Sequence, residues 1–139
     1  HDFEVVQANL SFNHHAGTLR GMHYQVAPVG DPKIVRCISG TIFDVVIDLR
    51  PSSPTYCKWV GAELSATNRN SLIIPAGCAH GFLTIEPDTE VLYLMGAPFV
   101  PDLASGVRWN DPTFGILWPE KPAIINDRDA NYPDYEPSK

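Results

Sequence analysis

The sequence predicts an all-β domain, and three observations lead to that fold class. Thirteen prolines and ten glycines interrupt the 139 residues, which is too frequent for long helices. Between these interruptions lie short runs rich in Val, Ile, Leu, Phe and Thr, each about as long as a strand. No amphipathic helix pattern exceeds about two turns. Many short strands in one small domain are typical of a sandwich, a barrel or a jelly roll.

Eight strands are expected before an irregular tail. In chain order they are residues 5–12, 18–26, 33–38, 41–49, 58–64, 70–74, 79–85 and 90–96. The clearest hairpin signal is Ser39-Gly40, which separates the third run from the fourth. The tail from residue 119 to residue 139 holds four prolines. We expect it to be either a docked irregular segment or a short helix around residues 126–131, which Asn126 could cap.

Composition and charge exclude several classes of protein. Hydrophobic residues make up 44% of the chain and charged residues 19%, so intrinsic disorder is not expected. Ten Lys and Arg residues stand against 16 Asp and Glu residues, a net charge of −6. Without a basic tract, neither a nucleic acid nor a membrane surface is an expected partner. No apolar run approaches the ~18 residues that cross a bilayer, and the length predicts one domain over residues 1–139.

The cysteines indicate the compartment. Cys37, Cys57 and Cys78 are odd in number and have no CxxC spacing, which argues against a disulfide framework and against a zinc ribbon. Small buried thiols in a reducing compartment are the simpler interpretation. We therefore expect a cytoplasmic protein.

Polar residues that interrupt apolar strands are the candidate site residues. Side chains alternate between the two faces of a strand, so residues 41–49 divide into two sets. One face would carry Phe43, Val45, Ile47 and Leu49, and the other Ile42, Asp44, Val46 and Asp48. The carboxylates would face either solvent or a polar cavity. His23 and His80 each lie close to glycines, which permit close approach of a ligand; both a structural role and a site role stay open for them.

A metal site is an alternative interpretation of this pattern. Jelly-roll proteins that bind metal commonly carry paired ligands on one strand and a histidine on a later one. Here His23 is followed by Tyr24-Gln25, and His80 stands alone, so the usual three protein ligands are not present. The neighbours His14 and His15 would point to opposite faces of a strand. No metal is expected.

Several segments resemble the dTDP-4-dehydrorhamnose 3,5-epimerases. They are residues 17–25 (GTLRGMHYQ), 33–36, 40–50, 53–55, 74–83, 91–93, 109–112 and 126–129, which follow the family's order. The resemblance implies a cupin-like double-stranded β-helix (jelly roll) with a short irregular or helical C-terminal segment. It also implies a homodimer with strand exchange, no cofactor and no metal. The family's N-terminal segment is expected to be missing before His1.

The resemblance implies epimerisation at C3 and/or C5 of a nucleoside-diphosphate 4-keto-6-deoxyhexose, normally linked to dTDP. The ketone acidifies the C–H bonds next to it. A base removes a proton from one face of the sugar, an enolate forms, and an acid returns a proton to the other face. Two alternatives stay open: a nucleotide-sugar 3,4-ketoisomerase, and a metal-dependent or non-catalytic sugar-binding cupin.

Roles follow from the same resemblance. His23 is expected to be the base, oriented by Asp129, and Tyr93 the acid on the opposite face. Lys33 is expected to stabilise the charge that develops on the enolate oxygen. The expected substrate-binding residues are Gln7, Asn9, Arg20, Asp44, His80 and Arg128. Among them, Arg20 and His80 would hold the sugar and the diphosphate, and Asp44, in the same lining, would support the histidine or the lysine.

Two further expectations concern local departures. Arg20 and His23 are three residues apart and would fall on opposite faces of a regular strand, so a bulge near Gly21 is expected if both line one cavity. Phe99 stands where the family has a second active-site tyrosine, and Ala104 where it has a glutamate that contacts the nucleotide. These two departures put in question which nucleotide is bound and whether both carbons are inverted.

Overall fold

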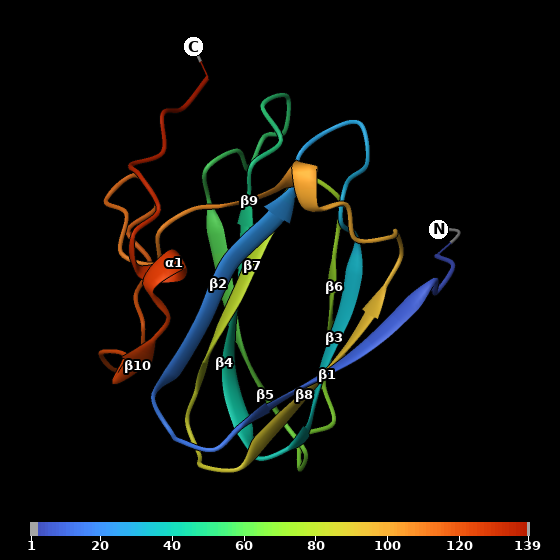
Figure 1. Ribbon diagram of the computed structural model, residues 1–139. Coiled ribbons are helices and arrows are strands. Elements are labelled where there is room, and N and C mark those ends of the chain that lie inside the picture. The colour runs from blue at the N-terminus through green and yellow to red at the C-terminus, as the bar shows by residue number, and fades with distance from the viewer. Residues whose placement is uncertain (1–2, 139) are drawn as a thin grey trace.

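The fold, described for residues 3–138 of a computed structural model, consists of two sheets that lie face to face (Figure 1). Within that range, a four-stranded sheet has the order β1 (Gln7–Asn13), β8 (Thr89–Met95), β3 (Lys33–Ser39), β6 (Ser71–Ile74). A six-stranded sheet has the order β10 (Ile124–Ile125), β2 (Thr18–Gln25), β7 (Cys78–Thr84), β4 (Thr41–Asp48), β5 (Trp59–Ser65), and β9 (Ala104–Gly106) also pairs with β2. The short helical elements are η1 (Pro101–Leu103) and α1 (Asp127–Ala130).

The all-β jelly-roll class is confirmed, and each of the eight expected strands occurs within two residues of its expected bounds. The sequence did not predict β9, β10 or η1, because segments of two or three residues are too short to show a period. The pairing of β10 with β2 is parallel, whereas the other strand pairs of the described residues are antiparallel. No helix of the described residues is long and apolar enough to span a membrane.

The hairpin expected at Ser39-Gly40 is wrong. β3 pairs with β6 and β8, whereas β4 pairs with β5 and β7 in the other sheet. The turn therefore carries the chain from one sheet to the other. Gly40 has a φ of +79°, and a Cβ there would collide with Thr89. A glycine of positive φ serves a sheet-to-sheet corner as well as a hairpin, so the local sequence does not distinguish them.

Both faces of β4 are buried, and its alternation is as predicted. Ile42 and Val46 belong to the core cluster between the two sheets. Val45 and Ile47 belong to a second cluster, which includes Phe114 from the C-terminal segment. A fully buried side chain of this size contributes roughly 1.5–3 kcal/mol. The C-terminal segment therefore supplies the cover that makes the outer face of this sheet a second core.

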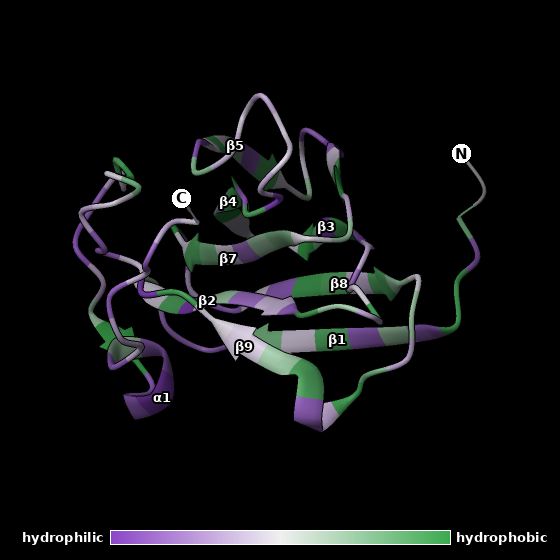
Figure 2. Cartoon of the chain, turned by 90° about the horizontal axis from the view of Figure 1, so that it is seen from above, coloured by the Kyte–Doolittle hydropathy of each residue, from purple (hydrophilic) through white to green (hydrophobic). Residues whose placement is uncertain are grey.

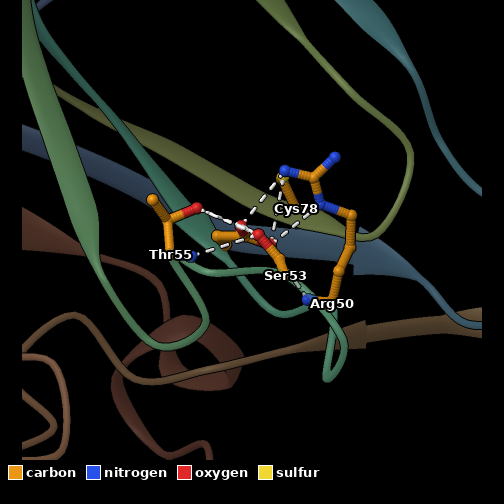
Figure 3. A network of polar contacts seen from close by, with 5 residues as sticks. Arg50, Ser53, Thr55 and Cys78 are labelled. Carbon is orange, nitrogen blue, oxygen red and sulfur yellow. Dashed lines mark hydrogen bonds and ion pairs between the residues drawn. The ribbon is translucent and has the colours of Figure 1, made fainter.

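Asp48 ends β4 and is buried rather than solvated. Its carboxylate accepts hydrogen bonds from Nε, Nη2 and the backbone N of Arg50 at 2.9, 3.1 and 3.0 Å. The hydroxyls of Ser53 and Thr55 donate to the same carboxylate, each at 2.5 Å, and Figure 3 shows these residues gathered beside Cys78. The hydrogen bond from Arg50 is the main cause that lowers the pKa of Asp48 below its ordinary value. The network fixes the loop between β4 and β5.

The three cysteines are free thiols. Cys37 and Cys78 are buried, and Cys57 is half-buried. Burial is the main cause that raises the pKa of each thiol. All three are therefore protonated and of low reactivity near neutral pH.

The tail was expected to be either a docked irregular segment or a short helix, and it is both. It is irregular and docked over most of its length, and it contains the short helix α1. Asn126 caps this helix as predicted, with its side chain accepting a hydrogen bond from the backbone N of Asp129 at 2.8 Å. The helix lies beside β2 (Figures 1 and 2). Further along, Arg108 donates to the carbonyl oxygen of Tyr132 at 3.0 Å and to Asp134 at 2.7 Å. The tail is thus held against the six-stranded sheet.

Candidate functional site

A pocket of about 380 Å³ opens between the two sheets and is bounded on one side by the C-terminal tail. This volume suits a small ligand or part of a larger one. The expected site residues that line it are Asn9, Arg20, His23, Lys33, His80, Tyr93 and Arg128. Asp44 and Asp129 lie directly behind the two histidines. Gln7 is not in the lining, but its amide donates to Asn9 at 3.1 Å.

His23 and Asp129 form a hydrogen-bonded pair, with Nε2 2.7 Å from Oδ1. The carboxylate is fully buried, whereas the His23 side chain is 37% exposed. The other oxygen of Asp129 accepts from the Gly21 backbone N and from the Asn126 amide, each at 3.1 Å. Burial acts to raise the pKa of Asp129, but the hydrogen bond and charge of His23 outweigh it and leave this pKa lowered. With Nε2 donating to a carboxylate, Nδ1 is the ring nitrogen left to accept a proton.

A second imidazole–carboxylate pair lies beside the first. His80 on β7 is directly opposite His23 on β2, and its Nε2 lies 2.5 Å from Oδ1 of Asp44. Both members are buried, and Oδ2 of Asp44 has no hydrogen-bond partner among the described residues. Asp44 therefore supports a histidine, as expected, but the expectation that it lies in the pocket lining is wrong. It lies on β4, which pairs with β7 and not with β2, so His80 is its neighbour.

Tyr93 faces this wall from the other sheet. It lies on β8, and its ring centroid is 5.9 Å from that of His80 in an edge-on arrangement. Burial, and then the charge of Asp44, raise the pKa of the Tyr93 hydroxyl above its ordinary value. The phenol therefore keeps its proton at neutral pH. Because β2 and β8 belong to different sheets, His23 and Tyr93 approach the pocket from opposite sides.

Cationic groups line the same pocket. Nζ of the buried Lys33 lies 2.8 Å from a carboxylate oxygen of Asp31. Nε of Arg20 donates to Oδ1 of Asn13 at 2.7 Å. Asn13 is buried and is itself fixed by donating to the carbonyl oxygens of Ser11 and Thr89. This contact uses only Nε of Arg20, so the two terminal nitrogens are left for an anionic ligand.

The expected bulge near Gly21 is confirmed. The pairing of β2 with β7 shifts register between Arg20 and His23, and both side chains line the pocket. Gly21 has a φ of +129°, and a Cβ there would meet the backbone of Gly81. The irregularity turns two residues that a regular strand would separate toward one cavity.

Four further residues of the lining matter to the site. Phe99 and Ala104, the two departures from the family, both lie in the pocket wall. Asp31 and Tyr132 also line it, although no pattern in the sequence predicted them as site residues. Asp31 lies in the irregular segment before Pro32, and Tyr132 in the irregular segment after α1. In such segments no period marks which side chain turns inward. The one feature of the sequence that could have pointed to Tyr132 is its spacing, because it stands three residues after the expected site residue Asp129.

Chemically, this arrangement can move protons across a bound molecule. One wall offers an imidazole with a free nitrogen, and the other offers a neutral phenol and, from the neighbouring strand, the ammonium group of Lys33. These are the parts of an acid–base site that stabilises a developing negative charge. Across residues 3–138, no group of three or more His, Cys, Asp and Glu side chains comes together as a metal site.

The comparisons with known proteins agree with this chemistry. The family model described as dTDP-4-dehydrorhamnose 3,5-epimerase matches residues 1–136. A relative of that name from Sinorhizobium fredii is 44% identical over 133 residues, which cover 95% of this chain and 68% of the relative. The chain thus spans about two thirds of that relative's length.

Solved structures of similar proteins carry related ligands. A dTDP-4-dehydrorhamnose 3,5-epimerase from Bacillus anthracis, with TDP and PPi bound, is 41% identical with a TM-score of 0.93, and the match covers 96% of this chain and 76% of that one. A dTDP-6-deoxy-D-glucose-3,5-epimerase from Legionella pneumophila, in complex with dTDP-4-keto-L-rhamnose, is 34% identical with a TM-score of 0.86, covering 91% and 67%.

Proposed function

This chain belongs to the dTDP-4-dehydrorhamnose 3,5-epimerase family, and we propose that it epimerises C3 and/or C5 of a dTDP-linked 4-keto-6-deoxyhexose. One observation carries the proposal: an imidazole–carboxylate pair and a phenol face the same pocket from opposite sheets. Inversion at carbon requires a proton to leave from one face of the sugar and to return on the other. A site with acid and base on one wall would exchange the proton without inverting the centre.

In this mechanism His23 is the base. Nδ1 takes the proton from the carbon next to the ketone, and the electron pair of the C–H bond moves into the enolate. Asp129 holds Nε2–H, fixes the tautomer and stabilises the imidazolium that forms. The lowered pKa of Asp129 keeps this carboxylate charged at neutral pH.

Tyr93 is the acid and returns a proton to the opposite face of the enolate. Lys33 donates to O4, where negative charge develops. Its half-buried partner Asp31 holds the ammonium group at the pocket wall. Once the carbon is protonated, the ketone is restored, and solvent returns His23 and Tyr93 to their starting protonation states.

Arg20, Arg128 and His80 bind the anionic and hydroxyl groups of the substrate in this scheme. Arg20 is fixed by Asn13, which leaves its fork free for phosphate oxygens. Asn9, supported by Gln7, extends the binding wall along β1. The overall sugar-nucleotide is larger than a pocket of about 380 Å³, so the hexose and the diphosphate occupy it and the nucleoside extends outward.

The experiment is incubation with dTDP-4-keto-6-deoxyglucose in D2O, followed by NMR. Deuterium at C3, at C5 or at both, with an inverted centre, supports the proposal. Movement of the carbonyl from C4 to C3 would indicate a ketoisomerase instead. An unchanged sugar would leave only a binding role and refute the epimerase activity.

We also propose a homodimer with strand exchange. The outer face of the four-stranded sheet carries apolar side chains around the exposed Arg36, with Leu10 and Ile73 exposed by 59% and 71% and Leu92 half-buried. A face of this kind is typical of a protein interface. β1 and β6 are the edge strands of that sheet, so each can accept a strand from a partner. A monomer by light scattering would refute this assembly.

The three free thiols support a reducing, cytoplasmic location.

A further inference from the structure

The C-terminal tail places a phenol, Tyr132, in the pocket wall beside His23. The two ring centroids lie 6.4 Å apart, and the ring planes meet at 76°. Aromatic rings attract one another in this edge-to-face geometry. Burial, followed by the charge of Asp129, raises the pKa of the Tyr132 hydroxyl. The base therefore has an aromatic neighbour to which the mechanism above gives no role.

Gly106 makes room for this ring. It lies on β9 directly opposite His23 on β2. A Cβ at Gly106 would collide with the outer carbons and the hydroxyl of Tyr132. The phenol end of the ring thus packs against Gly106 on β9, the strand that pairs with β2 at the base. Any side chain at this position would push the ring away.

The tail is fastened on both sides of Tyr132. Before it, Asn126 caps α1 and donates to the buried carboxylate of Asp129. At and after it, Arg108 holds the carbonyl oxygen of Tyr132 and the carboxylate of Asp134. One short segment thus brings both a carboxylate and an aromatic ring to His23.

We propose that Tyr132 is a positioning residue for the epimerisation: its ring holds the imidazole of His23 in place and closes the hexose site next to the base. The inference rests on the proposed function and deepens it. Asp129 fixes Nε2, but a bond at one ring atom still allows the imidazole to tilt, and the ring of Tyr132 blocks that tilt. A displacement of about 1 Å at a reacting group can cost ~10²-fold in rate, so the contact acts on turnover.

The test compares three variants with a matched control. Tyr132→Ala removes the ring, Tyr132→Phe retains it, and Gly106→Ala displaces it without altering Tyr132. The control, Tyr135→Phe, removes a phenol hydroxyl from the same tail; Tyr135 packs against Phe114, outside the pocket lining. Deuterium exchange at C3 and C5 gives kcat and KM, calorimetry gives the affinity for dTDP, and NMR follows the imidazole protons of His23.

We expect Tyr132→Ala and Gly106→Ala each to lower kcat by about 10–100-fold. Tyr132→Phe should retain most of kcat, and Tyr135→Phe should match the wild type. The affinity of every variant for dTDP should stay within about threefold of the wild type, or ~0.7 kcal/mol, because the change is local to the base. The His23 signals should shift, and their relaxation should show a more mobile imidazole, in the two variants that lose or displace the ring.

Wild-type kcat and unshifted His23 signals in both Tyr132→Ala and Gly106→Ala would overturn the inference. A parallel loss of kcat and of dTDP binding would also overturn it, because that pattern means that the tail has merely undocked. If the wild type exchanges neither carbon, the proposed function fails. The relaxation of the His23 signals still decides whether the ring holds the imidazole in place, because loss of the ring current alone shifts these signals.

Discussion

Replacing Asp129 by Asn tests the base most sharply, because the structure shows which way the amide must turn. The carboxylate is fully buried and accepts three hydrogen bonds: from Nε2 of His23, from the Gly21 backbone and from the Asn126 amide. Asparagine has only one acceptor oxygen at this place. If that oxygen faces His23, the new amide nitrogen faces two donors. Each buried donor left unpaired costs about 1–3 kcal/mol.

The opposite orientation of the amide costs less free energy, but it impairs catalysis. The amide oxygen then accepts hydrogen bonds from Gly21 and Asn126, and the new NH2 group faces Nε2 of His23. The imidazole accepts this hydrogen bond by moving its own proton to Nδ1, the nitrogen that should act as the base. Since general acid–base catalysis contributes ~10²–10⁴-fold, we expect kcat to fall by about that factor. The fold should lose only about 1–2 kcal/mol, because a charge-assisted bond is replaced by a neutral one.

Deuterium exchange at C3 and C5 measures the loss of rate, calorimetry with dTDP measures binding, and urea unfolding measures stability. The control is Asp127→Asn, a change in the same helix at an exposed carboxylate, which should leave all three unchanged. Exchange above about a tenth of the wild-type rate in Asp129→Asn, against the loss expected, would refute the tautomer argument. Loss of dTDP binding in step with kcat would show that Asp129 merely holds the tail.

Three other predictions follow. His23→Ala should lower exchange at both carbons by about 10²–10⁴-fold with the fold intact by circular dichroism; retention of more than about a tenth would exclude His23 as the base. Tyr93→Phe should keep exchange but lose inversion, so that label returns in the starting configuration; undiminished inversion would assign the acid to another group. Asp48→Asn should lower the free energy of unfolding by about 2–3 kcal/mol, because Arg50, Ser53 and Thr55 lose a charged acceptor. The pKa of Asp48 is lowered on folding, so its contribution is present above about pH 4 and is lost as the pH falls through the folded value. The difference in the free energy of unfolding between wild type and variant should therefore disappear in acid. A difference that stays constant with pH would contradict this account.

Strand positions were predictable because they depend on local chemistry. Prolines and glycines end strands, and the period of two in residues 41–49 places Ile42 and Val45 on opposite faces. The bulge near Gly21 was also predictable, because a regular strand could not turn both Arg20 and His23 toward one cavity. Each of these features involves residues only a few positions apart.

The candidate site was predictable only in part. The resemblance named His23 and Asp129, but their hydrogen bond joins residues 106 positions apart, and no local pattern contains such a contact. Which histidine Asp44 supports was not predictable, because strand order, not strand content, decides that β4 lies beside β7. Tyr132 was not found because an irregular segment has no period that marks its inward side chains.

The sequence by itself determined the eight longer strands, their alternating faces and the family to which the chain belongs. Only the tertiary structure decided that Ser39-Gly40 is a corner between sheets, that the two histidines lie side by side with separate carboxylates, and that a tail phenol reaches the base. The physical reason is the range of the interactions. Backbone preferences and side-chain alternation act over neighbouring residues, whereas sheet order, burial and pocket walls arise from packing between segments that are remote in the chain.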